Sequence, residues 1–196
     1  MSNLSPRGQQ TRAQILDVAW RVIAERGTQV SMADIAAAVG LTRQAIYVHF
    51  RSRGGLLVAL VRRADERADI HARFRAALRV DDPRRRLDAF LIVWLEFVPI
   101  IHPVASSLMR ARADDPEAAA AWHDRMTALR RGFAILATTL RRDGALAPSW
   151  TAPRAADYLW AGSSVQTWEL LAVDRGWGAA RTATVLRRTL AAAVLA

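Results

Sequence analysis

Apolar residues recur at helical spacing almost from the start of the chain. Over residues 15–23 they occupy positions i, i+3, i+4, i+7 and i+8, which is typical of the buried face of an amphipathic helix. Thr11 and Gln14 form a capping-box signature before this stretch, and Gly27 follows it. The pattern therefore predicts a helix that begins near Thr11 and ends before Gly27.

Two short helices are predicted next, joined by the sequence Val39-Gly40-Leu41-Thr42. Ser31 and Asp34 repeat the capping-box signature before an apolar stripe that ends at the glycine. Thr42 is a good N-cap for a helix that reaches Phe50. Three short helices with this connection indicate a helix-turn-helix.

Longer helices are predicted over the rest of the chain. Ser52 can cap a helix from about residue 52 to 79, although Gly54 and Gly55 weaken its first turn. Pro99 and Pro103 are expected to break or kink the helix that Pro83 opens. Three more helices are predicted. One begins at Pro116, the next covers about 153–174, and the last ends near Leu195.

The pattern contains no credible strand, internal repeat or low-complexity linker. The predicted fold class is therefore all-α, with an N-terminal three-helix helix-turn-helix head joined to a C-terminal helical bundle. We expect a DNA-binding domain over 8–68 and a ligand-binding and dimerisation domain over 69–196.

Composition and charge narrow the function. Of 196 residues, 52% are apolar and 23% charged, which indicates a globular chain with a sizeable core. All 28 basic residues are arginine, and with 18 acidic residues they give a net charge of +10. This excess suggests a polyanion such as nucleic acid, or an acidic membrane surface. The absence of cysteine excludes disulfides, thiolate metal sites and a cysteine nucleophile.

Membrane and enzymatic functions find little support. The longest stretch without Asp, Glu or Arg, residues 97–109, is shorter than the roughly 18–20 residues that a span needs. Residues 1–12 are polar and lack the apolar core of a signal peptide. The histidines have no metal-ligand spacing, and we find no carboxylate pair, phosphate loop or nucleophile elbow. We expect a cytoplasmic protein that is associated with the nucleoid when it is bound to DNA. We expect it not to be an enzyme, and to have no membrane partner, metal or cofactor.

The third predicted helix carries the residues that favour DNA binding. Ile46 and Phe50 can anchor it, so that the opposite arc faces a major groove. Arg43 can pair with guanine and Gln44 with adenine, while either Ala45 or Val48 can touch a thymine methyl. Tyr47 can donate its hydroxyl to a phosphate. The first 55 residues hold seven arginines and three acidic residues. Their net positive charge per residue is higher than that of the rest of the chain, as DNA binding requires.

Other arginines are expected to be solvated. Arg7 and Arg12 lie before the first apolar stripe, where they either remain in solvent or form an arm toward DNA. Arg84, Arg85 and Arg86 follow a helix start, where positive charge opposes the helix dipole. We interpret these three as a solvated face.

A specific combination of residues covers about 47 positions of the N-terminal region. It consists of Thr11-x3-Ile15-x3-Ala19, Gly27, Ile35-Ala36-x2-Val39-Gly40-Leu41-Thr42, Ile46-Tyr47-x-His49-Phe50 and Leu56-Leu57. In these residues the sequence resembles the TetR/AcrR family of bacterial transcription regulators. Asp174-Arg175-Gly176-Trp177 is more loosely similar to an actinobacterial branch of that family.

The resemblance implies a homodimer whose recognition helices enter successive major grooves of a palindromic operator in double-stranded DNA. It assigns base-facing positions to Arg43, Gln44 and Ala45. It also assigns phosphate-facing positions, which are Ser31, Thr42, Tyr47 and His49. The family usually has lysine and then an acidic residue where this chain has Arg53 and Gly54. Arg53 can still bind phosphate.

The resemblance also implies that the C-terminal helices bind a ligand and dimerise. Aromatic and sulfur-containing side chains are candidates to line a cavity for a flat apolar or cationic ligand: Trp94, Phe97, Trp122, Met126, Phe133 and Trp160. Their helical spacing is equally explained if they only fill the core. The candidate dimer contacts are Tyr158, Val165, Trp168, Leu186 and Leu190.

We therefore expect a sequence-specific transcriptional repressor that a small, largely apolar or aromatic effector releases from its operator. Two alternatives remain open. One is a helical small-molecule-binding protein with weak, non-specific DNA affinity, and the other is an activator of the same fold.

Overall fold

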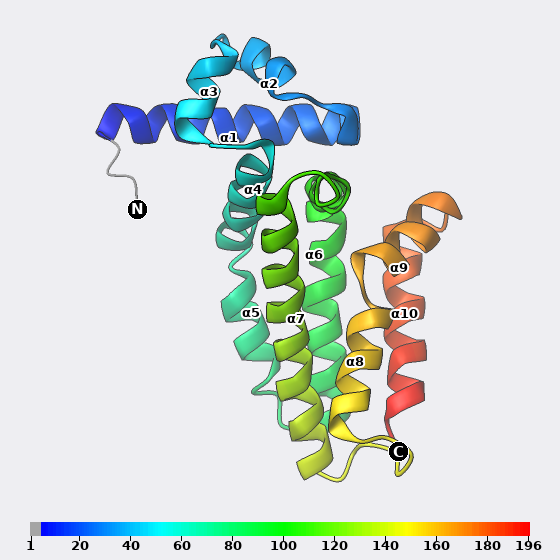
Figure 1. The fold of residues 1–196 in the computed structure, drawn as a ribbon. Helices are drawn as coiled ribbons and strands as arrows, with labels where there is room; N and C mark the ends of the chain where they lie inside the picture. The colour runs from blue at the N-terminus through cyan, green and yellow to red at the C-terminus, as the bar shows by residue number, and fades with distance from the viewer. Residues whose placement is uncertain (1–4) are drawn as a thin grey trace. The chain divides into compact units, whose positions relative to one another are not determined.

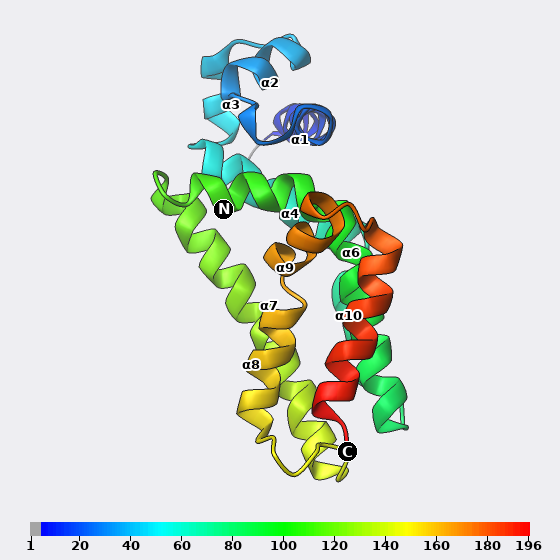
Figure 2. The ribbon, with the colours of Figure 1, turned by 90° about the vertical axis from the view of Figure 1, so that its right-hand side faces the viewer.

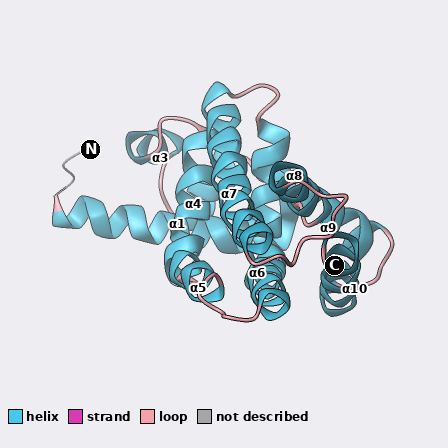
Figure 3. Ribbon diagram, turned by 90° about the horizontal axis from the view of Figure 1, so that it is seen from below, coloured by secondary structure: helices cyan, strands magenta, loops and turns pink. Residues whose placement is uncertain are grey.

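The computed structural model describes residues 5–196, except for the side chain of Thr28. Over these residues the chain is helical, with one isolated antiparallel bridge between Leu146 and Leu195 (Figure 3). The predicted all-α fold class is confirmed. The elements are α1 (Pro6–Arg26), η1 (Gly27–Gln29), α2 (Met32–Val39), α3 (Arg43–His49), α4 (Arg53–Arg67), α5 (Ile70–Ala77), α6 (Pro83–Ala111), α7 (Pro116–Arg142), α8 (Ala152–Gly162), α9 (Val165–Glu169), η2 (Leu170–Asp174) and α10 (Ala179–Val194).

The chain packs as two compact units, which we describe separately. The head unit contains the described residues up to Ala64 together with Pro103–His123. The body unit contains Asp65–His102 and Asp124–Ala196. The polar N-terminal segment considered above falls partly on residues 1–4, which lie outside the described residues.

Helix α1 begins earlier than its apolar stripe predicts. Ser5 is the N-cap, its hydroxyl accepting the Gly8 N–H at 3.3 Å, and Pro6 occupies the first helical position. The hydroxyl of Thr11 donates to the carbonyl of Arg7 inside the helix, so Thr11 is not a cap. The predicted start was wrong because a polar first turn adds nothing to the apolar periodicity.

The helix-turn-helix has the predicted boundaries. Ser31 and Asp34 form the reciprocal capping box, with the Ser31 N–H donating to the carboxylate at 2.8 Å and the Asp34 N–H to the hydroxyl at 3.1 Å. Gly40 ends α2 at φ 78°, a left-handed conformation that glycine adopts without strain. The Thr42 hydroxyl caps α3 by accepting the Ala45 N–H at 3.1 Å. Figures 1 and 2 show α2 and α3 lying together beside α1.

Two predicted helices are interrupted. Between α4 and α5, Asp69 takes the left-handed conformation at φ 44°, which aspartate tolerates better than most residues. The predicted helix over 153–174 is divided at Ser163 and Ser164. Ser163 donates its hydroxyl to the Leu159 carbonyl at 2.6 Å, and Ser164 caps α9 before the π-helical segment η2. Serine hydroxyls compete locally with helical hydrogen bonding, which apolar periodicity does not report.

Pro99 and Pro103 were expected to break or kink helix α6; it is one helix through both prolines, so of these two alternatives the break does not occur. Leu95, Val98 and Val104 around the prolines are at most 1% exposed, and this burial outweighs the lost hydrogen bonds. By length and composition α6 is apolar enough to cross a membrane, but 61% of its most apolar window is buried inside the protein. It therefore has the burial of a core helix.

Arg86 is a correction to the predicted solvated face. Arg84 and Arg85 are exposed, whereas Arg86 is only 6% exposed. Its guanidinium donates to the carbonyls of Val80 at 2.7 Å and Asp81 at 2.8 Å, and pairs with the Asp143 carboxylate at 2.5 Å. A buried arginine needs partners of this kind, and they come from a loop and from the end of α7.

Candidate nucleic-acid interface

Helix α3 is anchored by one face and exposes the other. Ile46 is fully buried and Phe50, its C-cap, is 3% exposed. Thr42, Arg43 and Gln44 are exposed at its start. Val48 is 74% exposed, the largest exposure among the large apolar side chains that the structure describes. A short helix held in this way presents its leading residues to whatever lies opposite it.

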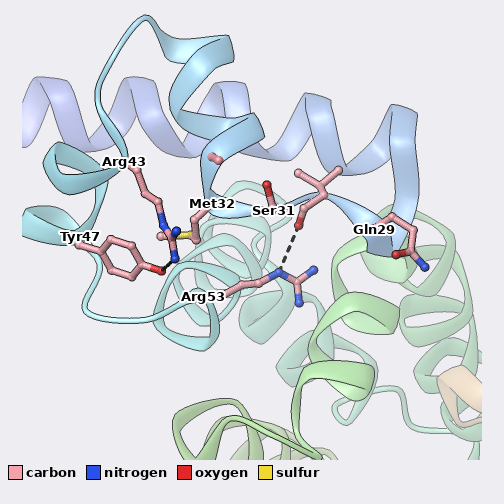
Figure 4. Close-up of a pocket in the computed structure, with 8 residues that line it drawn as sticks. Gln29, Ser31, Met32, Arg43, Tyr47 and Arg53 are labelled. Atoms are coloured by element: carbon pink, nitrogen blue, oxygen red, sulfur yellow. Dashed lines mark hydrogen bonds between the residues drawn. The ribbon is translucent and has the colours of Figure 1, made fainter.

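An open groove of about 400 Å³ lies beside α3 (Figure 4). Its lining residues come from the η1–α2 segment, from α3 and from the first residue of α4: Gln29, Val30, Ser31, Met32, Ala33, Arg43, Tyr47 and Arg53. Four of these are predicted DNA-binding residues, namely Ser31, Arg43, Tyr47 and Arg53. The structure therefore brings together residues from three separate segments of the sequence.

Arg43 and Tyr47 hold each other at one side of the groove (Figure 4). The Arg43 Nη2 donates to the Tyr47 hydroxyl at 3.3 Å, and the guanidinium carbon lies 5.5 Å from the centre of the tyrosine ring. Stacking and a hydrogen bond limit the conformations of a long side chain. A single neutral acceptor leaves other guanidinium N–H groups available to a ligand.

Arg53 contributes the second cation of the groove. Its Nε donates to the carbonyl of Val30 at 3.2 Å, which ties the start of α4 to the segment before α2 (Figure 4). Burial lowers the pKa of the Arg53 guanidinium, and the Asp115 carboxylate acts in the opposite direction. The side chain stays protonated at neutral pH, because arginine is effectively never deprotonated in proteins. A partly dehydrated guanidinium is well suited to bind phosphate.

The other predicted DNA-binding residues lie outside the groove lining. Thr42, Gln44 and Ala45 form the first turn of α3, with Thr42 serving as its cap. His49 is half-buried, and its ring centre lies 6.5 Å from that of Phe50. Its Nδ1 is buried and has no hydrogen-bond partner among the described residues.

Two features of the head unit were not predicted from the sequence. Arg12 is half-buried, with its guanidinium carbon 4.7 Å from the centre of the Phe50 ring, where solvation or a DNA-facing arm was expected. Burial lowers the pKa of Arg12, as do the charges of Arg62 and Arg63. Gln29 lines the groove, yet its only sequence signal is its place two residues before a capping box.

The candidate ligand-binding residues fall into both units. In the body unit Trp94, Phe97 and Phe133 are at most 5% exposed, and Trp94 donates its indole N–H to the Ser163 carbonyl at 2.7 Å. Met126 and Trp160 are half-buried, and the Trp160 indole N–H has no hydrogen-bond partner among residues 5–196. Trp122 belongs to the head unit, where the guanidinium carbon of Arg112 lies 5.6 Å from its ring centre. Whether these side chains touch a ligand stays a prediction.

The candidate dimer contacts differ in exposure. Tyr158 on α8 is 40% exposed and packs its ring 5.0 Å from that of Trp150. The other four candidates are at most 6% exposed within their own protomer: Val165, Trp168, Leu186 and Leu190. Helices α8 and α10, which carry three of the five candidates, lie side by side in Figures 1 and 2. The dimer stays a prediction.

An all-helical chain with a helix-turn-helix and a basic groove beside its third helix has the features of a DNA-binding regulator. Residues 15–60 match the family described as bacterial regulatory proteins, tetR family. A 66-residue stretch is 44% identical to the HTH-type transcriptional regulator TtgR of Pseudomonas putida, and covers 33% of this chain and 31% of TtgR. The chain thus matches about a third of the length of this curated relative.

Solved structures resemble nearly the whole chain. A transcriptional regulator from Saccharomonospora viridis in complex with choline has a TM-score of 0.77 and 23% identity, over 96% of this chain and 99% of that one. A SmeT–triclosan complex has a TM-score of 0.73 and 18% identity, over 96% and 93% of the two chains. At these identities the likeness shows the fold.

Residues 15–60 therefore match the TetR family of transcriptional regulators, in the region whose motifs predicted the resemblance. The matched family and relative are described as regulators. These descriptions agree with the expectation of a protein that is not an enzyme.

Proposed function

We propose that the protein is a cytoplasmic repressor that binds a palindromic operator in double-stranded DNA as a homodimer. Residues 8–68 bind DNA in this proposal, and residues 69–196 bind an effector and dimerise. The observation that carries it is the groove in which Arg43 and Arg53 meet Ser31 and Tyr47, beside an anchored helix with an exposed polar start. Two such heads about 34–36 Å apart reach successive major grooves.

The proposed contacts divide between bases and backbone. Arg43, Gln44 and Ala45 reach base edges from the first turn of α3. Phosphates are contacted by hydroxyls and cations around that turn: Ser31, Thr42, Tyr47, His49 and Arg53. The base contacts supply sequence preference, whereas the phosphate contacts supply salt-dependent affinity.

The proposed effector is small and largely apolar or aromatic. Choline and triclosan in complexes of the same fold support a ligand of this size, and the aromatic side chains of the body unit offer suitable surfaces. Such a ligand releases DNA only if it binds more tightly to a conformation with another head spacing.

The test is recovery of fragmented DNA from the source genome by the purified protein at about 0.15 M salt, where phosphate-only binding is strongly screened. Enrichment of a few palindromic sites supports a dimeric, sequence-specific regulator and identifies its neighbouring genes. Uniform recovery contradicts the proposal and favours a small-molecule-binding protein with non-specific DNA affinity. A reporter gene behind the enriched site then separates repression from activation.

Arg43→Ala tests the assignment of base contacts. We expect about tenfold weaker binding to the enriched site, concentrated on one base pair, because a bidentate arginine–guanine pair contributes about 1–3 kcal/mol of discrimination. Affinities are measured on the site, on single-base variants and on random duplex. Equal loss on all of these duplexes would show that Arg43 contacts only the backbone.

A further inference from the structure

The double glycine at the start of α4 lies against the start of α7, within the head unit. The Gly54 N–H donates to Oδ2 of Asp115 at 2.9 Å. The other oxygen of the same carboxylate accepts the N–H groups of Glu117 at 2.9 Å and Ala118 at 3.1 Å. One carboxylate therefore caps two helices, its own and one that begins about 60 residues earlier.

A second carboxylate reinforces the contact. The Ser52 hydroxyl donates to Oε2 of Glu117 at 2.5 Å and accepts the Gly55 N–H at 2.9 Å. Ser52 thus caps α4, as predicted, but it does so while bound to α7. Two negative charges lie at the positive end of the α4 dipole, although the first turn of α4 itself contains no acidic residue.

A side chain at position 54 has no room, and a side chain at position 55 would displace the Glu117 carboxylate. A Cβ at Gly54 would lie 2.7 Å from the Ala118 nitrogen and 2.7 Å from the Asp115 carboxylate. A Cβ at Gly55 would lie 2.9 Å from a carboxylate oxygen of Glu117. The glycines that weaken the helix by propensity are therefore the residues that allow the two carboxylates to approach it.

This contact bears directly on the groove, because Arg53 is the residue before Gly54. The Arg53 side chain is fixed at its other end by the Val30 carbonyl, 3.2 Å from Nε. Asp115 also favours the charged form of Arg53 electrostatically, without replacing its contact to Val30. The position of the guanidinium in the groove thus depends on the first turn of α4, which the α6–α7 turn holds.

We propose that Asp115 and Glu117 are positioning residues of the DNA-binding groove, which hold the start of α4 and thereby place Arg53 for a DNA phosphate. The inference rests on the proposed function, since it assigns a role within the DNA-binding site. Asp115 and Glu117 themselves carry negative charge and do not contact DNA.

The test compares Asp115→Asn with Asp114→Asn in the full-length protein. Both substitutions remove one negative charge, but Asp114 is exposed and makes no side-chain hydrogen bond or ion pair among residues 5–196. We expect Asp115→Asn to bind the enriched operator about five- to tenfold more weakly than Asp114→Asn, because asparagine keeps one acceptor oxygen but turns a donor NH2 toward the N–H groups that the other carboxylate oxygen accepts. Its salt slope should fall by about one, because one phosphate contact is lost.

A double variant shows whether Asp115 acts through Arg53. If it does, Asp115→Asn adds little to the loss that Arg53→Ala already causes, because neighbouring residues in one network are not additive. Additive losses with an unchanged salt slope would overturn the inference and leave Asp115 a purely structural role. A lower folded fraction alone reduces apparent affinity but leaves the salt slope unchanged.

Hydrogen exchange separates failure of this inference from failure of the proposed function. We expect the Gly54 and Gly55 amides to exchange slowly in the wild type and in Asp114→Asn, and faster in Asp115→Asn. If the wild type lacks operator binding while this difference persists, the contact is real and the proposed function fails. If both amides exchange at the same rate in all three proteins, the inference is overturned whatever the DNA affinity.

Discussion

The arginines of the two units are held in different ways. In the body unit, arginines from successive helices form ion pairs with carboxylates: Arg73 with Glu96, Arg86 with Asp143, Arg125 with Asp65, Arg130 with Asp157 and Arg187 with Asp88. In the head unit, Arg43 is held by a tyrosine hydroxyl, while Arg53 donates to a backbone carbonyl and is also influenced by the Asp115 carboxylate. Arg63 and Asp17 pair outside the groove.

The different partners of the arginines indicate different roles for positive charge in the two units. A carboxylate neutralises the arginine that it binds, whereas a hydroxyl or a carbonyl fixes the side chain and leaves its charge intact. At Arg43 the groove can therefore attract an anion with a cation that is already oriented. In the body unit the same residue type serves mainly to connect helices.

The largest expected effect comes from removing a paired arginine of the body unit. Arg86→Ala should lower the free energy of unfolding by about 3 kcal/mol, because the arginine is buried and two backbone carbonyls lose their donor. Urea denaturation measures this change. DNA affinity per folded molecule should stay the same.

Arg130→Ala is the matched control, since its ion pair with Asp157 is about half exposed on both sides. Its effect should stay below about 1 kcal/mol. If Arg86→Ala is equally mild, or if it changes the salt slope of DNA binding, the comparison between the units is wrong.

A smaller effect is expected in the head unit from Tyr47→Phe. The ring that stacks on Arg43 is kept, but the hydroxyl that accepts from its guanidinium is lost. Operator affinity should fall about threefold, while the unfolding free energy changes by less than about 0.5 kcal/mol. Fluorescence anisotropy on labelled operator measures the first and urea denaturation the second. A purely structural role for Tyr47 predicts the reverse pattern.

The smallest effect concerns pH. Burial alone would raise the pKa of the Asp115 carboxyl, but hydrogen bonds from the Gly54, Ala118 and Glu117 N–H groups hold that pKa below its usual value. Its stabilising effect is therefore complete above the unfolded pKa of about 3.9 and is lost as pH falls through the folded pKa.

At neutral pH, Asp115→Asn should melt about 2–4 °C below Asp114→Asn, because one set of N–H donors loses its acceptor. Below about pH 3.9 this gap should begin to narrow, and it should close as pH falls through the lowered folded pKa of the Asp115 carboxyl. Thermal unfolding of both variants from pH 7 to pH 3 tests the expectation. A gap that stays constant over this range contradicts it.

Sequence predicted the helix-turn-helix well because its boundaries are set by local chemistry. The capping box of Ser31 and Asp34, the left-handed Gly40 and the Thr42 cap all act within four residues. The exposed face of α3 follows from the positions of two buried anchors, Ile46 and Phe50.

Two kinds of feature were not predicted: those that depend on distant contacts, and local interruptions of helical hydrogen bonding. Pro99 lies inside a continuous helix because its neighbours are buried, and burial comes from elements far away in the sequence. Asp69 and Ser163 interrupt helices whose apolar periodicity continues across them. Periodicity measures which face of a helix can be buried, and it does not measure where its hydrogen bonding stops.

In the candidate site, too, residues within a local motif were predicted and contacts between distant segments were not. The motif predicted Ser31, Arg43, Tyr47 and Arg53, and the structure brings all four to one groove. No local pattern connects the groove with Asp115, because the two are linked by hydrogen bonds between segments about 60 residues apart.

The double glycine has an evolutionary consequence. Almost any side chain at position 54 would collide with the backbone of α7, so this position cannot drift alone. A side chain at position 54 would also push away the Asp115 carboxylate that accepts the N–H of this position, whereas a side chain at position 55 meets only the movable end of Glu117. Descendants of this protein are therefore expected to keep or lose Gly54 and Asp115 together, as one inherited pair.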